Sequence, residues 1–263
     1  MKPSLPDKFR LPTLTLAAHA YEHKRPSGIM SDQTAERWFH QINQQYSDVP
    51  LPEFELVNGI IARSMVIDYA LLGVIATHQR VAVTDLGCGF STREYRLNFF
   101  DGWWIHVDLP DVLHVRLGME PRQSSEISIA YDLSDVSNWP LGHDLPEPLA
   151  LTKRLFILEG LLNHLRREQA EALLSLLHQR YRGHKVIGTV ITENGLKGAQ
   201  SLSADLGLSE AMWAIKDQDE LTEVLGGIKL ERIWFLGKIA SQIGLIRPGT
   251  GDEASGLVFL ATL

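Results

Sequence analysis

The chain has 263 residues, of which 44% are hydrophobic and 22% are charged, and its formal net charge is −7. These values are typical of a soluble globular protein, and the length suits one large α/β domain or two small ones. The acidic balance disfavours a nucleic-acid partner, because neutralising phosphates requires clustered lysine and arginine. A single cysteine, Cys88, excludes an internal disulfide framework and a cysteine-based zinc site, so a cytoplasmic location is expected.

Residues 1–80 are predicted to form an N-terminal helical cap. Ser31 and Asp32 could cap a helix whose apolar residues follow helical spacing, namely Ala35, Trp38, Phe39 and Ile42. A further helix is expected to begin near Glu55. The longest clean apolar run, residues 69–76, is much shorter than the roughly 20 residues that a membrane span needs, so no membrane contact is expected.

Strands and helices are predicted to alternate from residue 81 onward. The expected strands cover residues 81–86, 103–107, 126–131, 155–158, 185–192, 228–235 and 257–263. An amphipathic helix is expected over residues 166–181. Residues 193–215 are interpreted mostly as a helix packed on the sheet, with Trp213 left open as a wall of a substrate pocket. The alternation predicts a mostly parallel sheet covered on both faces, with residues 81–263 as the core and residues 1–80 as part of the same domain.

A glycine-rich turn follows the first predicted strand, in the pattern Asp85-x-Gly87-x-Gly89. Dinucleotide-binding turns carry a third glycine, and this chain has Thr92 there. S-adenosylmethionine fits the pattern better, because its ammonium group needs carboxylates or carbonyls and it has no pyrophosphate. A tight turn without a ligand is the structural alternative.

Acidic residues also end the next three strands. Asp108 could accept hydrogen bonds from ribose hydroxyls, and Asp132 could accept one from an adenine amino group beside the backbone N–H of Leu133. Glu159, next to Gly160, suits an ammonium group. Each has a structural alternative: a turn aspartate, a helix cap and a surface glutamate. Carboxyl ends of parallel strands meet at one edge of a sheet, so these residues are expected to surround one ligand.

Ordered sequence blocks resemble the leucine carboxyl methyltransferase family, especially its polyketide O-methyltransferase branch. The blocks lie at residues 85–97, 106–110, 132–133 and 158–165, with weaker upstream matches around Arg63 and His19. The resemblance implies a Rossmann-like class I methyltransferase fold with a seven-stranded, mostly parallel sheet and a C-terminal antiparallel hairpin.

The resemblance also implies S-adenosylmethionine as the cofactor and assigns its contacts. Arg63 would bind the methionine carboxylate, a role that suits the bidentate guanidinium group. The glycines of the turn would face the methionyl part, Asp108 the ribose, and Asp132 with Leu133 the adenine. Glu159 would face the amino end; Asp85, Leu109 and Gly160 complete the predicted cofactor-binding set. The chain departs from the family pattern at Ser91, His164 and His19.

Methyl transfer to a carboxylate needs no general base near neutral pH, whereas a hydroxyl acceptor needs one. His164 is the best candidate for a base or an acceptor contact, with Tyr21 and His19 in the cap as further catalytic candidates. No metal is expected. The leading hypothesis is O-methylation of a small molecule, most simply a carboxylic acid. The alternatives are a methyltransferase for protein or peptide C-terminal carboxylates, a nicotinamide-dependent oxidoreductase, and a non-catalytic cofactor-binding module.

Overall fold

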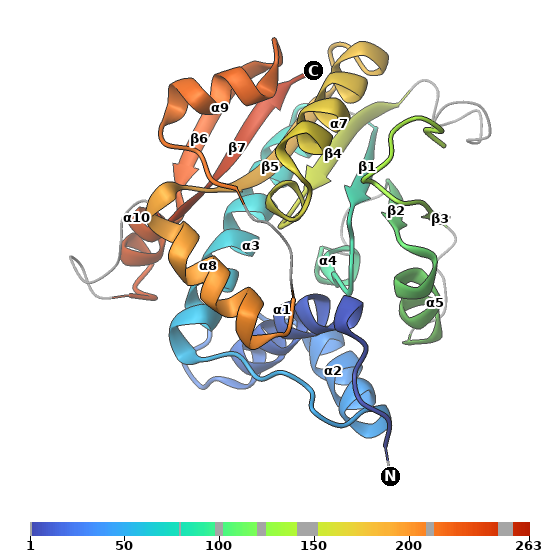
Figure 1. Ribbon diagram of the computed structural model, residues 1–263, viewed down its shortest axis with the longest axis vertical. Coiled ribbons are helices and arrows are strands. Elements are labelled where there is room, and N and C mark those ends of the chain that lie inside the picture. Colours follow the sequence, from blue (N-terminus) through green and yellow to red (C-terminus); the bar gives the residue numbers. More distant parts are fainter. Residues whose placement is uncertain are drawn as a thin grey trace.

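The computed structural model describes residues 2–78, 80–97, 102–119, 125–140, 152–208, 213–246 and 255–263. Within them, seven strands form one sheet in the order β3-β2-β1-β4-β5-β7-β6 (Figure 1). The strands are β1 (Val81–Leu86), β2 (Trp103–Asp108), β3 (Glu126–Ala130), β4 (Lys153–Leu158), β5 (Lys185–Ile191), β6 (Lys229–Phe235) and β7 (Gly256–Thr262). The first five pair in parallel, and β7 runs antiparallel between β5 and β6. The predicted sheet and its antiparallel C-terminal hairpin are confirmed.

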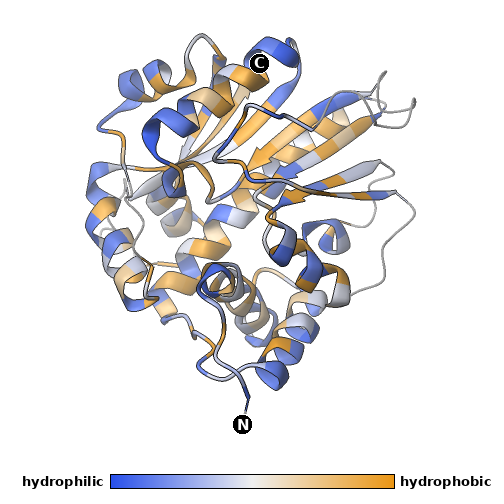
Figure 2. Cartoon of the chain, turned by 45° about the vertical axis from the view of Figure 1, so that its right-hand side comes forward, coloured by the Kyte–Doolittle hydropathy of each residue, from blue (hydrophilic) through white to orange (hydrophobic). Residues whose placement is uncertain are grey.

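Helices cover both faces of this sheet. Successive strand residues point to opposite faces, so Val81 and Val83 join one apolar cluster while Ala82 and Leu86 join another. The first cluster packs against α3 (Phe54–Ala76) and α10 (Leu236–Gln242), and the second against α7 (Arg167–Arg180) and α9 (Gln218–Leu225). Figure 2 shows the apolar residues concentrated on the strands.

The central helix of the cap, α3, has the length and the mean hydropathy of a membrane-spanning segment, which the shorter run considered above does not have. In the fold, half of its most apolar 18-residue stretch is buried. Val66, Ile67 and Leu71 contact the sheet, and Asp68 is paired with arginine. The apolar character of α3 is therefore accounted for by packing against protein.

The rest of the cap is formed by α1 (Asp7–Lys24) and α2 (Gln33–Gln45), which pack against each other. Asp32 caps α2 as predicted, because its side chain accepts a hydrogen bond from the backbone N–H of Ala35 at 2.9 Å. Figure 1 places α1 below the strands, close to the short helix α4 (Arg93–Arg96) that follows the glycine-rich turn. The cap thus lies against the carboxyl ends of β1 and β4.

Three further elements complete the described chain: α5 (Pro110–Met119), the 3-10 turn η1 (Leu162–His164) and α8 (Glu193–Asp205). The interpretation of residues 193–215 as mostly core was wrong for α8, in which Ser203 is the one buried residue. One of its leucines, Leu202, instead lines a cavity at the carboxyl ends of β1 and β4. Met212, in the same predicted segment, lies outside the described residues.

Candidate active site

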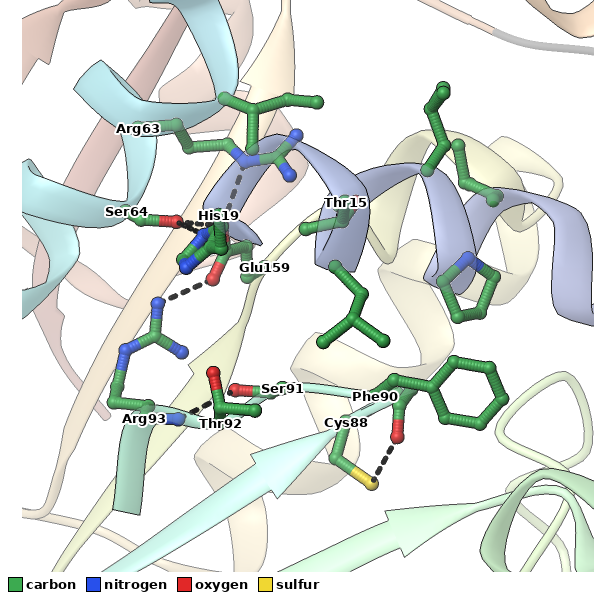
Figure 3. A pocket seen from close by; sticks show the side chains of 18 of the residues that line it. Thr15, His19, Arg63, Ser64, Cys88, Phe90, Ser91, Thr92, Arg93 and Glu159 are labelled. Atoms are coloured by element: carbon green, nitrogen blue, oxygen red, sulfur yellow. Dashed lines mark hydrogen bonds and ion pairs between the residues drawn. The ribbon is translucent and has the colours of Figure 1, made fainter. Parts of the chain in front are cut away.

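A cavity lies under α1 at the carboxyl ends of β1 and β4 (Figure 3). Five parts of the chain line it: α1, α3, the glycine-rich turn with the end of β1, the turn after β4, and Leu202 of α8. It brings together most of the sequence-predicted site residues: His19, Arg63, Asp85, Gly87, Gly89, Glu159, Gly160 and His164. The cavity thus brings acidic residues at the ends of strands together with residues of the cap.

The glycines of the cavity adopt a left-handed backbone conformation. Gly87 has a φ of 70° and Gly89 a φ of 51°, values that favour glycine. A Cβ atom on Gly87 would lie 3.0 Å from Cδ1 of Leu161, and one on Gly89 would lie 3.2 Å from Cβ of Pro12. Side chains at these positions would therefore strain the turn and crowd the cavity.

Asp85 is a buried carboxyl group at the wall of the cavity. Its Oδ2 atom has no hydrogen-bond partner among the residues that the structure describes, and the nearest cation, Nη1 of Arg93, is 3.9 Å away. Burial raises the pKa of Asp85 to about 6, and the charge of Arg93 opposes this rise. An unsatisfied acidic oxygen of this kind suits a cationic ligand group.

Glu159 is held as a carboxylate by two guanidinium groups. Its Oε1 accepts from Nε of Arg63 at 2.8 Å and its Oε2 from Nη2 of Arg93 at 2.5 Å. Figure 3 shows the two arginines reaching it from different sides. Burial alone would raise the pKa of Glu159, but the charges of Arg93 and Arg63 outweigh burial and hold the pKa well below its usual range.

A buried ion-pair network extends from this site into the cap. Arg93 donates to Asp68 at 2.6 Å, and Arg96 bridges Asp68 at 2.9 Å and Asp32 at 2.8 Å. Asp32 also accepts from the hydroxyl of Thr92 at 2.6 Å. This network was not predicted from the sequence. The available signal was the spacing of Arg93 and Arg96, which places both side chains on one face of a helical turn.

His19 is tied into the same network. Its Nδ1 lies 3.0 Å from Oδ2 of Asp32, and its Nε2 lies 3.0 Å from the hydroxyl of Ser64. Burial lowers the pKa of His19 and outweighs the opposing hydrogen bond to Asp32. The imidazole is therefore neutral at physiological pH, with both nitrogen atoms engaged.

Tyr21, the other catalytic candidate from α1, does not line this cavity. Its side chain is 43% exposed, and its ring packs 6.1 Å from that of Phe39. It borders a separate, shallow pocket with Phe54 and Arg25. The difference follows from helical geometry, because residues two apart on a helix point in different directions. His164, by contrast, reaches the main cavity from η1.

Four residues assigned to the adenosine lie outside the cavity lining. Asp108 accepts the backbone N–H groups of Gly89 and Leu109, each at 2.7 Å; burial raises its pKa and these hydrogen bonds partly oppose the rise. Leu109 is 37% exposed. Asp132 is exposed and accepts the N–H of Ser134 in a local turn, while Leu133 packs in the core. Their contacts with the adenosine stay predictions.

One group of possible metal ligands occurs among the described residues, formed by Glu94, His106 and Glu126. Arg116 already supplies a cation there, because its Nη2 contacts Glu94 and lies 3.4 Å from Nε2 of His106. The same guanidinium group donates to the carbonyl of Ser91. Arg116 therefore links this cluster to the glycine-rich turn by hydrogen bonds.

The residues of the cavity fit S-adenosylmethionine. Asp85 offers an unsatisfied carboxyl oxygen and Glu159 a second carboxylate, both suited to an ammonium group. Arg63 is 22% exposed and its terminal nitrogens are not used by Glu159, so it retains donors for a carboxylate. Gly87 and Gly89, both in the left-handed conformation, form the turn that lines the cavity beside these groups.

Comparisons with known proteins agree with this fit. The sequence pattern of the family described as leucine carboxyl methyltransferase matches residues 13–178. The chain is similar to the tetracenomycin polyketide synthesis O-methyltransferase TcmP of Streptomyces glaucescens, with 24% identity over 228 residues, covering 84% of this chain and 80% of TcmP.

Solved structures show the same fold. A crystal structure of a candidate methyltransferase from Thermobifida fusca YX aligns with a TM-score of 0.61 and 16% identity, covering 99% of this chain and 95% of that one. The magnesium protoporphyrin IX methyltransferase of Synechocystis PCC 6803, solved with bound S-adenosylhomocysteine, aligns with a TM-score of 0.51 and 15% identity, covering 88% and 94%. The chain therefore belongs to the leucine carboxyl methyltransferase family and is an S-adenosylmethionine-dependent methyltransferase with the class I fold that the resemblance implied.

Proposed function

We propose that this methyltransferase O-methylates a small carboxylic acid with an apolar body. The observation that carries the proposal is the composition of the cavity under α1. Its polar lining lies mainly at the strand ends, whereas α1, α3 and α8 contribute an apolar lining that includes Leu14, Leu56, Ile60 and Leu202. A wall of this kind favours a hydrophobic acceptor held above the cofactor residues. The name of the relative TcmP, a polyketide O-methyltransferase, supports an acceptor of this class.

The cofactor supplies an electrophilic methyl group on a sulfonium. Around it, Arg63 would hold the methionine carboxylate, and Asp85 and Glu159 would hold the ammonium group. Glu159 is already held in one orientation by two arginines. Preorganised groups of this kind reduce the entropic cost of alignment.

The chain's own residues have two tasks in the reaction: alignment and exclusion of water. α1 covers the glycine-rich turn, with Pro12 packed against Gly89. An acceptor carboxylate is ionised near neutral pH, so no residue has to remove a proton from it. His164 would then contact the acceptor rather than act as its base. His19 is engaged on both nitrogens and would stabilise the floor of the cavity.

The position of α1 over the cavity also favours a small-molecule acceptor over a protein or peptide acceptor. A protein or peptide C-terminus requires an open groove for its main chain, and the cavity instead lies beneath a helix. A small acid suits this shape better.

The test uses S-adenosylmethionine labelled in its methyl group and a panel of aromatic and aliphatic carboxylic acids. We expect a labelled product that releases labelled methanol in alkali, because methyl esters hydrolyse and methyl ethers do not. Arg63→Ala should abolish transfer, whereas the control Arg37→Ala, on an exposed residue of α2, should not. Alkali-stable labelling, or labelling only of peptides with a free carboxyl end, would contradict the proposal.

A further inference from the structure

The turn that carries His164 is held by an indole from a distant part of the chain. Trp213 places its Nε1 atom 3.0 Å from the carbonyl oxygen of Leu162 and 3.0 Å from that of Leu165. One N–H group thus serves the two carbonyls on either side of His164. A 3-10 turn of this length has little hydrogen bonding of its own, so these contacts bear on its orientation.

The residue directly before His164 is fixed as well. Asn163 is buried, and its amide uses both ends: Nδ2 donates to the carbonyl of Trp213 at 2.6 Å, and Oδ1 accepts the N–H of Ile191 at 3.0 Å. A buried amide that is satisfied at both ends has a single favourable orientation. His164 therefore lies between Asn163 and Leu165, and each of these two residues is hydrogen-bonded to Trp213.

The segment that bears Trp213 is itself anchored to the sheet. The N–H of Ile215 donates to the carbonyl of Ile191 at 3.0 Å, and the N–H of Glu193 donates to the carbonyl of Ile215 at 3.0 Å. Trp213 does not line the cavity, so it has no direct access to a substrate there. It was considered above as a possible pocket wall, and the structure gives it a different place.

We propose that Trp213 and Asn163 are positioning residues that set the direction in which His164 faces the acceptor. This inference rests on the proposed function, in which His164 contacts the acceptor. The connection runs from the end of β5 through Asn163 and Trp213 to the turn, so the ring of His164 is placed by the rigid sheet rather than by a free loop. Misplacement of a contact by about 1 Å can slow a reaction about 100-fold.

The main variant is Trp213→Phe, which removes the N–H group and keeps an aromatic ring near the guanidinium group of Arg167. The matched control is Trp139→Phe. Trp139 is buried where Trp213 is partly buried, and its Nε1 donates to the hydroxyl of Tyr181 at 2.9 Å, away from the cavity. We expect Trp213→Phe to lower kcat about tenfold at unchanged affinity for S-adenosylhomocysteine, while Trp139→Phe leaves kcat within about twofold. Both should lower the melting temperature.

The same substitution in a His164→Ala background shows whether Trp213 acts through His164. We expect Trp213→Phe to have almost no further effect on kcat there, since coupled residues are not additive. An equal loss in both backgrounds would overturn the positioning role and leave a purely structural one. Asn163→Ala, which removes the donor to Trp213 together with the acceptor for Ile191, should lower kcat at least as much as Trp213→Phe does.

A readout without turnover separates this inference from the proposed function. In protein labelled with ¹⁵N at histidine, the His164 imidazole signals are identified by their loss in His164→Ala. Trp213→Phe should shift them and Trp139→Phe should not. If no carboxylic acid is methylated but the shift occurs, the positioning role stands and the acceptor proposal fails. Unshifted His164 signals in Trp213→Phe would refute the positioning role whatever the acceptor is.

Discussion

The carboxyl group of Asp85 is poorly stabilised in the cofactor-free fold. Its pKa is raised to about 6 from 3.8, mainly by burial, so folding takes up a proton between these pH values. The contribution of this group to stability is therefore present below about pH 4 and is lost as the pH rises through about 6. The same ionised, unsatisfied oxygen is what a cationic ligand group would need.

Asp85→Asn should consequently change stability and cofactor affinity in opposite directions. At pH 8 we expect the free energy of unfolding of the cofactor-free protein to rise by about 2 kcal/mol, because a buried charge is removed. Affinity for S-adenosylmethionine should fall about tenfold or more. Urea unfolding and titration calorimetry measure the two quantities.

The pH dependence gives the control for this prediction. In the unmodified protein, affinity should weaken as the pH falls below about 6, and in Asp85→Asn it should be nearly flat over the same range. If Asp85→Asn is less stable than the unmodified chain, or if it binds the cofactor with the same affinity, Asp85 is a structural residue.

The sequence could place some of these side chains and not others. Asp85 and Glu159 could be predicted because the carboxyl ends of parallel strands meet at one edge of a sheet. Asp32 could be predicted only as a helix cap. Its second contact, with Arg96, depends on how the cap packs against the core, and no local spacing reports that. Tyr21 was misplaced relative to the cavity for the related reason that the rotation of α1 about its axis is set by tertiary packing.

The start of α2 is fixed by several contacts of one residue. Asp32 caps it through Oδ1, while Oδ2 receives hydrogen bonds from Arg96, Thr92 and His19. Burial would raise the pKa of Asp32, but the hydrogen bond from His19 and the charge of Arg96 hold it well below its usual range. Asp32 therefore joins the start of a helix to a buried cation.

Asp32→Ala should lower the free energy of unfolding by about 3–5 kcal/mol, because it removes a cap and leaves the buried guanidinium of Arg96 with one partner fewer. Asp217→Ala is the matched control. Asp217 caps α9 by accepting the N–H of Glu220, but it is exposed and outside the network. Its loss should cost about 1 kcal/mol. Equal losses in urea unfolding would mean that capping alone explains Asp32.

Element positions were largely predictable, and the exception has a physical cause. The strands are short apolar runs bounded by glycine or acidic residues, so β1 and β2 begin where the sequence predicts. Residues 193–215 were predicted to be mostly core because residues 196, 202 and 206 are leucines, and of these only Leu206, which follows α8, is buried. Apolar composition does not give burial by itself, and Leu202 of α8 lines the pocket instead.

At the scale of the whole molecule, the cap and the core are joined in two ways. α3 contributes Val66, Ile67 and Leu71 to the apolar cluster on one face of the sheet. The ion pairs of Arg93 with Asp68 and of Arg96 with Asp32 cross the boundary between residues 1–80 and residues 81–263 and are largely buried. Separating the two parts would expose an apolar face and would remove carboxylate partners from two buried guanidinium groups.

The full chain should therefore unfold as one cooperative unit. In scanning calorimetry we expect a single transition whose calorimetric and van't Hoff enthalpies agree. High salt screens exposed pairs much more than buried ones, so adding about 1 M sodium chloride should not split the transition. Two resolved transitions would show that residues 1–80 fold as a separate domain. The buried arginines favour a single unit, because a cap that opened alone would take Asp68 away from Arg93 and both carboxylate partners, Asp68 and Asp32, away from Arg96.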